Sequence, residues 1–319
     1  MRLLSTPLLL LLAFALPALG QSDFPAWAYP LTPGAPPPIR DEGKTYRVPE
    51  SNVELTLTQI RNRFQAADWH PSDHPAMPPI VANGKAPDVW ACGICHRPGG
   101  TGGPENAGIA GLPADYIVQQ LKDLASGARS TAVPERRPHQ LKTPVAKGLT
   151  EQEMAEAARY FAALKPQQLI LVTESATAPK LRERTFFFSP TDDGAREPIG
   201  NRIVEYPEDV ERFELLRDGR VRFIAWVPPG SIARGEALVK SQTRPGAMAC
   251  ASCHGADLKG VGSIPPIAGR SPTYIVRQLW DLKQGARNGA MAPLMKPIVM
   301  TMSSVEMVDI ASYLATLKP

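Results

Sequence analysis

Blocks of like charge and long apolar stretches are both missing from this sequence of 319 residues. The 35 basic and 31 acidic residues are spread along the chain and leave a formal net charge of +4, so no nucleic-acid-binding surface stands out. Beyond the amino terminus, no apolar run approaches the ~20 residues that a membrane-spanning helix needs. We therefore expect a mature chain with no membrane span and no nucleic-acid partner.

The amino terminus has the pattern of a secretory signal. One basic residue, Arg2, precedes an apolar run over residues 8–16, and the segment Ala18–Gly20 supplies small residues after it. This run is short for a membrane anchor and typical of the apolar region of a cleaved signal peptide. We predict that residues 1–20 are removed when the chain is exported.

Cysteine and histidine are scarce, with four and five residues, yet the four cysteines form two Cys-x-x-Cys pairs that are each followed by histidine, in Cys92–His96 and Cys250–His254. An exported chain with four cysteines would ordinarily form two disulfides, but Cys-x-x-Cys-His is the attachment signature of a c-type haem. One helical turn lets both thiols add to the vinyl groups of one porphyrin, and the adjacent imidazole then lies under the iron. The predicted attachment residues are Cys92, Cys95, Cys250 and Cys253, and the predicted proximal iron ligands are His96 and His254.

An internal repeat extends well beyond the cysteines. Placing His96 on His254 gives an offset of 158 positions (254 minus 96), and after the third matching element the offset falls to 153, where Tyr160 meets Tyr313. The first copy therefore holds five extra residues (158 minus 153) between these landmarks. Such self-similarity indicates two copies of one structural unit. The matching elements are Ile109–Gly111 with Ile267–Gly269, Tyr116–Val118 with Tyr274–Val276, and Gly127–Arg129 with Gly285–Arg287.

The repeat defines two small modules, residues 79–166 and 230–319. We expect a mainly α-helical protein. A covalently held haem can serve as much of the core of modules this small. Between them, residues 167–229 are rich in β-branched and aromatic residues and broken by turn signals, so we expect a β-rich insert. An amino-terminal extension, residues 21–78, begins Pro-rich and is expected to hold one helix over about 53–66.

The last helix of the second module has clear sequence signals. Met307, Ile310 and Leu314 recur at helical spacing on one face, and Ser303 or Ser304 is a plausible N-cap. This helix is expected to close the module.

The two modules resemble class I cytochromes c in tandem, as in the diheme cytochromes c of bacterial periplasms. The resemblance implies two covalently bound haem c groups and transfer of single electrons in the periplasm. In that family the distal ligand is a methionine on the loop before the last helix, which implies Met295 for the second haem. The neighbouring Met291, Met300 and Met302 are interpreted as packing residues.

The family also expects a proline-containing loop whose carbonyl holds the proximal histidine. Pro265–Ile267 fits this pattern in the second module. In the first module Gly108 stands where Pro266 stands, which weakens the expected rigidity of the loop, although a backbone carbonyl could still accept the His96 hydrogen bond.

The distal side of the first haem departs from the family pattern. At offset 153, Met295 falls on Lys142, and no methionine occurs between Ile94 and Met154. We expect His139, an imidazole on the same loop, to be the distal ligand. The alternatives are the aligned Lys142, an open or water-bound iron, or a residue of the extension; the extension candidates are His70, His74 and Met77.

These expectations favour a periplasmic electron carrier. Its partners would be redox proteins, with a dehydrogenase or respiratory complex as donor and a cytochrome or oxidase as acceptor. The alternative is a haem enzyme, for example peroxidase-like or oxidising a small sulfur compound at the first haem, although the lack of a fifth cysteine excludes thiolate ligation there. A third hypothesis is an electron-transfer subunit of a dehydrogenase complex, docked through the extension and the insert.

Overall fold

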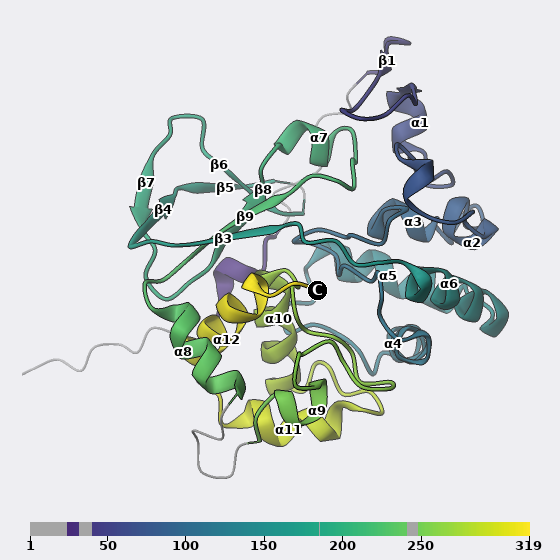
Figure 1. Cartoon of the computed structure of the whole chain (residues 1–319). Coiled ribbons are helices and arrows are strands. Elements are labelled where there is room, and N and C mark those ends of the chain that lie inside the picture. Colours follow the sequence, from purple (N-terminus) through teal and green to yellow (C-terminus); the bar gives the residue numbers. More distant parts are fainter. Residues whose placement is uncertain (1–23, 32–39, 185, 241–247) are drawn as a thin grey trace, which may run out of the picture.

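The computed structural model describes residues 24–31, 40–184, 186–240 and 248–319. Figure 1 shows the first helical module at the right, the second at the lower centre, and the β-rich insert above the second. The predicted signal, residues 1–20, and the Pro-rich run at 36–38 lie outside the described residues.

The first module places a short haem-motif helix beside three longer helices. Helix α6 begins with a capping box, in which the Thr150 hydroxyl accepts from the Glu153 amide and the Glu153 carboxylate accepts from the Thr150 amide. Its buried face, with Ala158 and Phe161, packs on Val81 in the core. The helices are α2 (Pro79–Ala82), α3 (Cys92–His96), α4 (Ala114–Ser126), α5 (Arg137–Lys147) and α6 (Glu151–Ala163).

The second module repeats this order. Its closing helix begins at Ser304 behind a capping box formed by Ser303 and Glu306, so the first of the two predicted N-caps is confirmed. Gly235 lets the first and last helices approach closely, because a Cβ at this position would overlap the carbonyl oxygen of Asp309. The helices are α8 (Ser231–Lys240), α9 (Ala251–His254), α10 (Pro272–Lys283), α11 (Ala292–Met300) and α12 (Ser304–Thr316).

Within the described ranges, no single helix combines the length and apolar character that crossing a membrane requires. Helices α11 and α12 meet the test only as a pair, and they are bent by 119° at the break between them.

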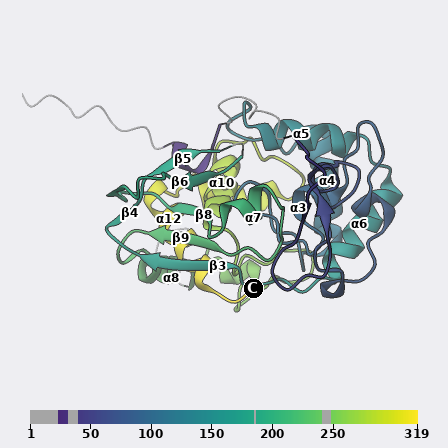
Figure 2. The ribbon, with the colours of Figure 1, turned by 90° about the horizontal axis from the view of Figure 1, so that it is seen from above.

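The insert contains strands that pack against the second module. In its three-stranded sheet, β9 lies between a parallel β3 and an antiparallel β8. Phe213 stacks edge-to-face on Phe187 and Phe223, and Ala315 of α12 joins the same cluster, so the strands lie against α12 (Figure 2). The elements are β3 (Ile170–Glu174), β4 (Thr177–Pro179), β5 (Leu181–Glu183), β6 (Phe188–Pro190), β7 (Arg196–Pro198), β8 (Val204–Pro207), α7 (Val210–Glu214) and β9 (Phe223–Val227).

The extension departs from its predicted helix over about 53–66. Only Leu57–Arg61 forms an α-helix, α1. Upstream, β2 (Leu55–Thr56) pairs with β1 (Thr45–Tyr46), and downstream the Asn62 side chain accepts from the Phe64 amide, a local bond that competes with helix continuation. The single-turn 3₁₀ helices η1 (Ala26–Ala28) and η2 (Pro71–Asp73) complete the described part of the extension.

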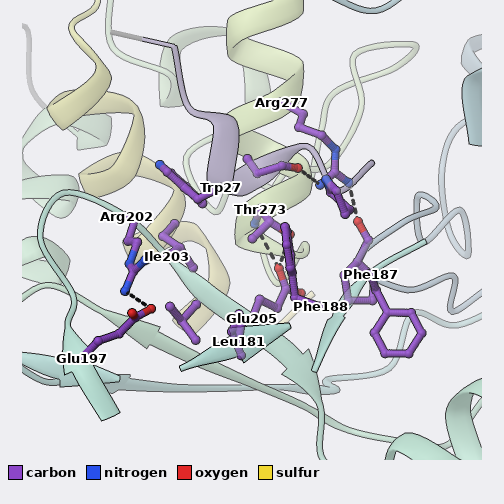
Figure 3. A pocket seen from close by; sticks show the side chains of 14 residues that line it. Trp27, Leu181, Phe187, Phe188, Glu197, Arg202, Ile203, Glu205, Thr273 and Arg277 are labelled. Carbon is purple, nitrogen blue, oxygen red and sulfur yellow. Dashed lines mark hydrogen bonds and ion pairs between the residues drawn. The ribbon is translucent and has the colours of Figure 1, made fainter. Parts of the chain in front are cut away.

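Glu205 on β8 links the insert to the second module through hydrogen bonds. Its Oε2 accepts hydrogen bonds from the Thr273 amide (3.0 Å) and the Ser271 hydroxyl (2.8 Å) at the start of α10, as Figure 3 shows for Thr273. A carboxylate at a helix amino terminus also complements the helix dipole. Glu205 is only 3% exposed, and this burial raises the pKa of its carboxyl group.

Replacing Glu205 with Gln should change how stability depends on pH. Below the ordinary glutamate value of 4.5 the side chain is protonated in both folded and unfolded chains. As pH rises through the higher folded-state pKa, the native protein must hold a buried charge, so the free energy of unfolding of the wild type should fall relative to that of Glu205→Gln. Denaturant unfolding at a series of pH values measures this difference. A difference that grows in favour of the wild type with rising pH contradicts the prediction.

Candidate haem sites

The thiols of both motifs are presented on helical turns. Cys92 and Cys95 lie on α3, while Cys250 caps α9 and Cys253 lies within it. Cys92, Cys95 and Cys253 are free thiols, so neither pair closes its own disulfide. Within the described ranges no group of three or more His, Cys, Asp or Glu residues could hold a metal ion. The arrangement therefore fits covalent attachment to a porphyrin.

Each predicted proximal histidine is held by one backbone carbonyl. His96 Nδ1 lies 2.9 Å from Ala107 O, and His254 Nδ1 lies 2.8 Å from Pro265 O. In each module the acceptor is eleven residues beyond the histidine (107 minus 96; 265 minus 254). Since Nδ1 must donate to a carbonyl, Nε2 keeps the lone pair that iron needs. Burial lowers the pKa of His254 and brings that of His96 to about 4, so both imidazoles stay neutral.

The first module has Gly108 where the second has Pro266, and an arginine of the second module supports this loop of the first. Arg270 donates through Nη1 to Gly108 O (2.9 Å) and through Nη2 to Ala110 O (3.4 Å). These bonds hold the loop that carries Ala107, the acceptor for His96. A side chain of the second module therefore helps to orient His96, the predicted proximal ligand of the first.

His96 opens onto a cleft that His139 and Lys142 also line. The cleft measures about 880 Å³ including the space at its mouth. Apolar side chains of α4 form one wall, and α10 of the second module forms another. Sequence reasoning missed the second-module residues here, although the matched Tyr274 lay inside the repeat. Those residues are Tyr274, Arg277, Gln278 and Asp281.

His139 and Lys142 face this cleft from consecutive turns of α5. His139 Nε2 lies 3.4 Å from the Ser130 hydroxyl, and burial lowers its pKa. Lys142 makes no hydrogen bond or ion pair within the part of the chain that the structure describes. Burial, followed by the nearby charge of Arg136, lowers its pKa to about 7. Its charge in turn helps to lower the pKa of His96, and both residues line the same cleft.

The candidate ligands from the extension lie elsewhere. His70 Nε2 pairs with Asp218 Oδ1 at 3.2 Å, and His74 Nε2 pairs with Asp68 Oδ1 at 3.1 Å. Met77 packs against the apolar core of the first module. None of these three side chains lines the cleft of His96.

In the second module, Met295 lies in the middle of α11 and packs, partly buried, against the core that Cys250 also contacts. Met291 and Met300 are 47% and 51% exposed, whereas Met302 is fully buried. Trp280 is also buried and contacts Phe24. The methionine that the family resemblance implies is thus the partly buried one of the four.

The repeated Gly-Ala-Arg elements meet at the boundary between the modules. Arg129 donates to Gln278 Oε1 (2.9 Å) and Tyr274 OH (3.2 Å) of the second module. Arg287 donates to Tyr116 OH (2.8 Å) and Gln120 Oε1 (3.1 Å) of the first. Two backbone bonds of 2.7 Å, from Ser130 N to Ala286 O and from Asn288 N to Ala128 O, join the loops themselves. The modules therefore face each other with approximate twofold symmetry, and each arginine reaches across.

Two modules of this kind, each with its thiol pair and oriented imidazole, define a tandem haem-binding protein. The Cytochrome c family matches residues 232–318. A thiosulfate dehydrogenase electron acceptor of Thiomonas intermedia is 29% identical over 233 residues, 72% of this chain and 79% of that protein. Cytochrome c4 of Azotobacter vinelandii is 25% identical over 76% of this chain and 90% of that protein.

A shorter relative matches more closely. Cytochrome c-554(548) of Halomonas halodenitrificans is 37% identical over 65 residues, 20% of this chain and 78% of that protein. Among solved structures, a thiosulfate dehydrogenase from Marichromatium purpuratum has a TM-score of 0.48 and 26% identity, and the match covers 74% of this chain and 38% of that one. The chain belongs to the cytochrome c family, as two class I modules in tandem with two covalently bound haem c groups.

The crossed arginines should stabilise the boundary cooperatively. Arg129 and Arg287 share Gln120 and Gln278 as acceptors, so replacing either with Met should lower the free energy of unfolding by about 1 to 2 kcal/mol. Denaturant unfolding of both single variants and the double variant measures the coupling between them. Arg159→Met, at an exposed position of α6, is the control and should change little. Strictly additive losses at Arg129 and Arg287 contradict the proposed sharing.

Proposed function

We propose that this chain is a periplasmic electron carrier that takes single electrons from a dehydrogenase and passes them to an acceptor cytochrome or oxidase. The observation that carries the proposal is the wall shared by the two modules. Helix α10 packs in the core of the second module, and its Arg277 and Gln278 also line the cleft of His96. Such a shared wall suits transfer between two sites within one molecule.

Bound haem iron supplies a reversible one-electron couple. The chain sets the surroundings of each iron. The carbonyls of Ala107 and Pro265 fix the two imidazoles, and buried apolar side chains of each module exclude water around them. No group in this arrangement needs to bind a substrate for the carrier to work.

The two irons are proposed to differ in their distal ligands. Met295 is the proposed ligand of the second, where a thioether stabilises ferrous iron and raises the potential. Among the described residues no methionine lines the cleft of the first, and its nitrogen donors opposite His96 are His139 and Lys142. Electrons then enter at the first haem and move downhill to the second.

The names of the relatives suggest a donor. Proteins 29% and 28% identical to this chain are thiosulfate dehydrogenase electron acceptors, so we propose a sulfur-oxidising dehydrogenase as the first donor to test. The amino-terminal signal pattern supports export to the periplasm, where such a donor and a terminal acceptor are both accessible.

Stopped-flow mixing tests the carrier role. The oxidised holoprotein should stay oxidised with thiosulfate alone and become reduced when thiosulfate dehydrogenase is added with thiosulfate. Reduced holoprotein should bind carbon monoxide slowly or not at all, because both irons have two protein ligands. Reduction by thiosulfate alone, or rapid carbon monoxide binding at one haem, contradicts the carrier proposal and favours an enzyme.

Replacing Met295 with His should give the second haem a nitrogen donor on its distal side, as proposed for the first. The methionine-to-iron charge-transfer band of the ferric protein should disappear, and the potential of the second haem should fall, since the thioether that favours ferrous iron is gone. Absorption spectroscopy and potentiometry of the holoprotein measure both effects. Met291→His, at an exposed position nearby, is the matched control and should leave both unchanged. Survival of the band in Met295→His excludes Met295 as the ligand.

A further inference from the structure

We infer that Lys142, through its Nζ atom, is the distal ligand of the first haem iron, opposite His96. This replaces the sequence-based expectation of His139. The inference deepens the proposed function, on which it rests for the two unequal irons. It does not depend on which dehydrogenase is the donor.

The first support is the structural register of the two modules. Helices α5 and α11 each contain one interior proline, Pro144 and Pro297. Lys142 and Met295 each stand two residues before that proline, on the offset of 153 found in the sequence (295 minus 142). The lysine therefore occupies the helical position that holds the distal methionine candidate in the other module. His139, one turn earlier, matches the buried Ala292 (292 minus 139).

The second support is that Lys142 lies in the His96 cleft without a partner. Three arginines and two carboxylates, Glu105 and Asp281, are the other charged side chains of the cleft. The charges of Arg136 and Arg129 disfavour a charged ammonium at Lys142. No carboxylate pairs with Lys142 among the described residues, whereas the exposed Lys122 and Lys85 both form ion pairs. A partly buried amine without a counter-ion is costly unless it is neutral or bound. Binding to iron satisfies its lone pair.

His139 is less well placed for the same role. It lies in the first turn of α5, and its Nε2 is already near the Ser130 hydroxyl. Two nitrogen donors cannot occupy the single position opposite His96. The structure gives that position to the donor at the matching register, which also has the longer and more flexible side chain.

The ligation step is balanced without a redox partner. The Lys142 ammonium releases one proton to water, and the Nζ lone pair then forms a coordinate bond to the iron. No electron is transferred. Lys142→Met removes this nitrogen donor. It places a methionine at the position that Met295 occupies in the second module.

Spectroscopy of the ferric full-length holoprotein tests the inference. Near-infrared magnetic circular dichroism and electron paramagnetic resonance should show one methionine-ligated and one nitrogen-ligated haem in the wild type. Lys142→Met should convert the nitrogen-ligated signal into a second methionine-ligated signal and raise the potential of that haem. His139→Ala should leave both signals in place. Lys147→Met, at an exposed position on the same helix, is the matched control.

Three results overturn the inference. The first is a nitrogen-ligated signal that persists in Lys142→Met. The second is loss of that signal in His139→Ala. The third is a wild type with a water-bound iron that binds carbon monoxide rapidly. If Lys142→Met does not accumulate, Lys142→Ala with added imidazole replaces it, and recovery of a low-spin signal by imidazole supports the inference. Reduction by a dehydrogenase is measured separately, so failure of the carrier proposal is distinguishable from failure of this assignment.

Discussion

The contact on which the rest of the structure depends is the crossing of Arg129 and Arg287 between the modules. Each guanidinium group hydrogen-bonds side chains of the opposite module, and the loops that carry them exchange backbone bonds. Through this contact α10 lies against the first module, and residues of α10 line the cleft of His96. The second module also supports the first, through the bonds from Arg270 to the loop beyond His96.

Because the contact between the modules is nearly symmetric, the differences between the two candidate haem sites can be traced to particular residues. The two proximal histidines have equivalent carbonyl partners, so the proximal side gives little reason for the irons to differ. Helices α5 and α11 each have an interior proline, but two residues before it one has Lys142 and the other Met295, the two proposed distal donors. We therefore attribute a difference in potential to the distal side. Among the described residues, none of the insert lines the cleft. The insert packs on α12, and its Glu205 bonds the start of α10.

The haem motifs and the two modules could be predicted from the sequence because their signals are local or periodic. The repeat also contained Gly127–Arg129 and Gly285–Arg287, but sequence comparison does not reveal that repeated residues face each other across a boundary. The predicted helix over about 53–66 is present only as α1, because pairing of β2 with β1 and the Asn62 side chain outweigh helix propensity at its two ends. The choice between His139 and Lys142 depends on burial and partners, which spacing alone does not give.

A spectroelectrochemical titration of the intact ferric holoprotein, with the ligand-specific bands recorded at each potential, tests the central claim most directly. The account predicts two separated steps. The methionine-ligated haem becomes reduced first, and the half-reduced protein then retains only the ferric signal of the nitrogen-ligated haem. Two signals that decline together at one potential, or a nitrogen-ligated signal that is lost first, would contradict an ordered relay from the first module to the second.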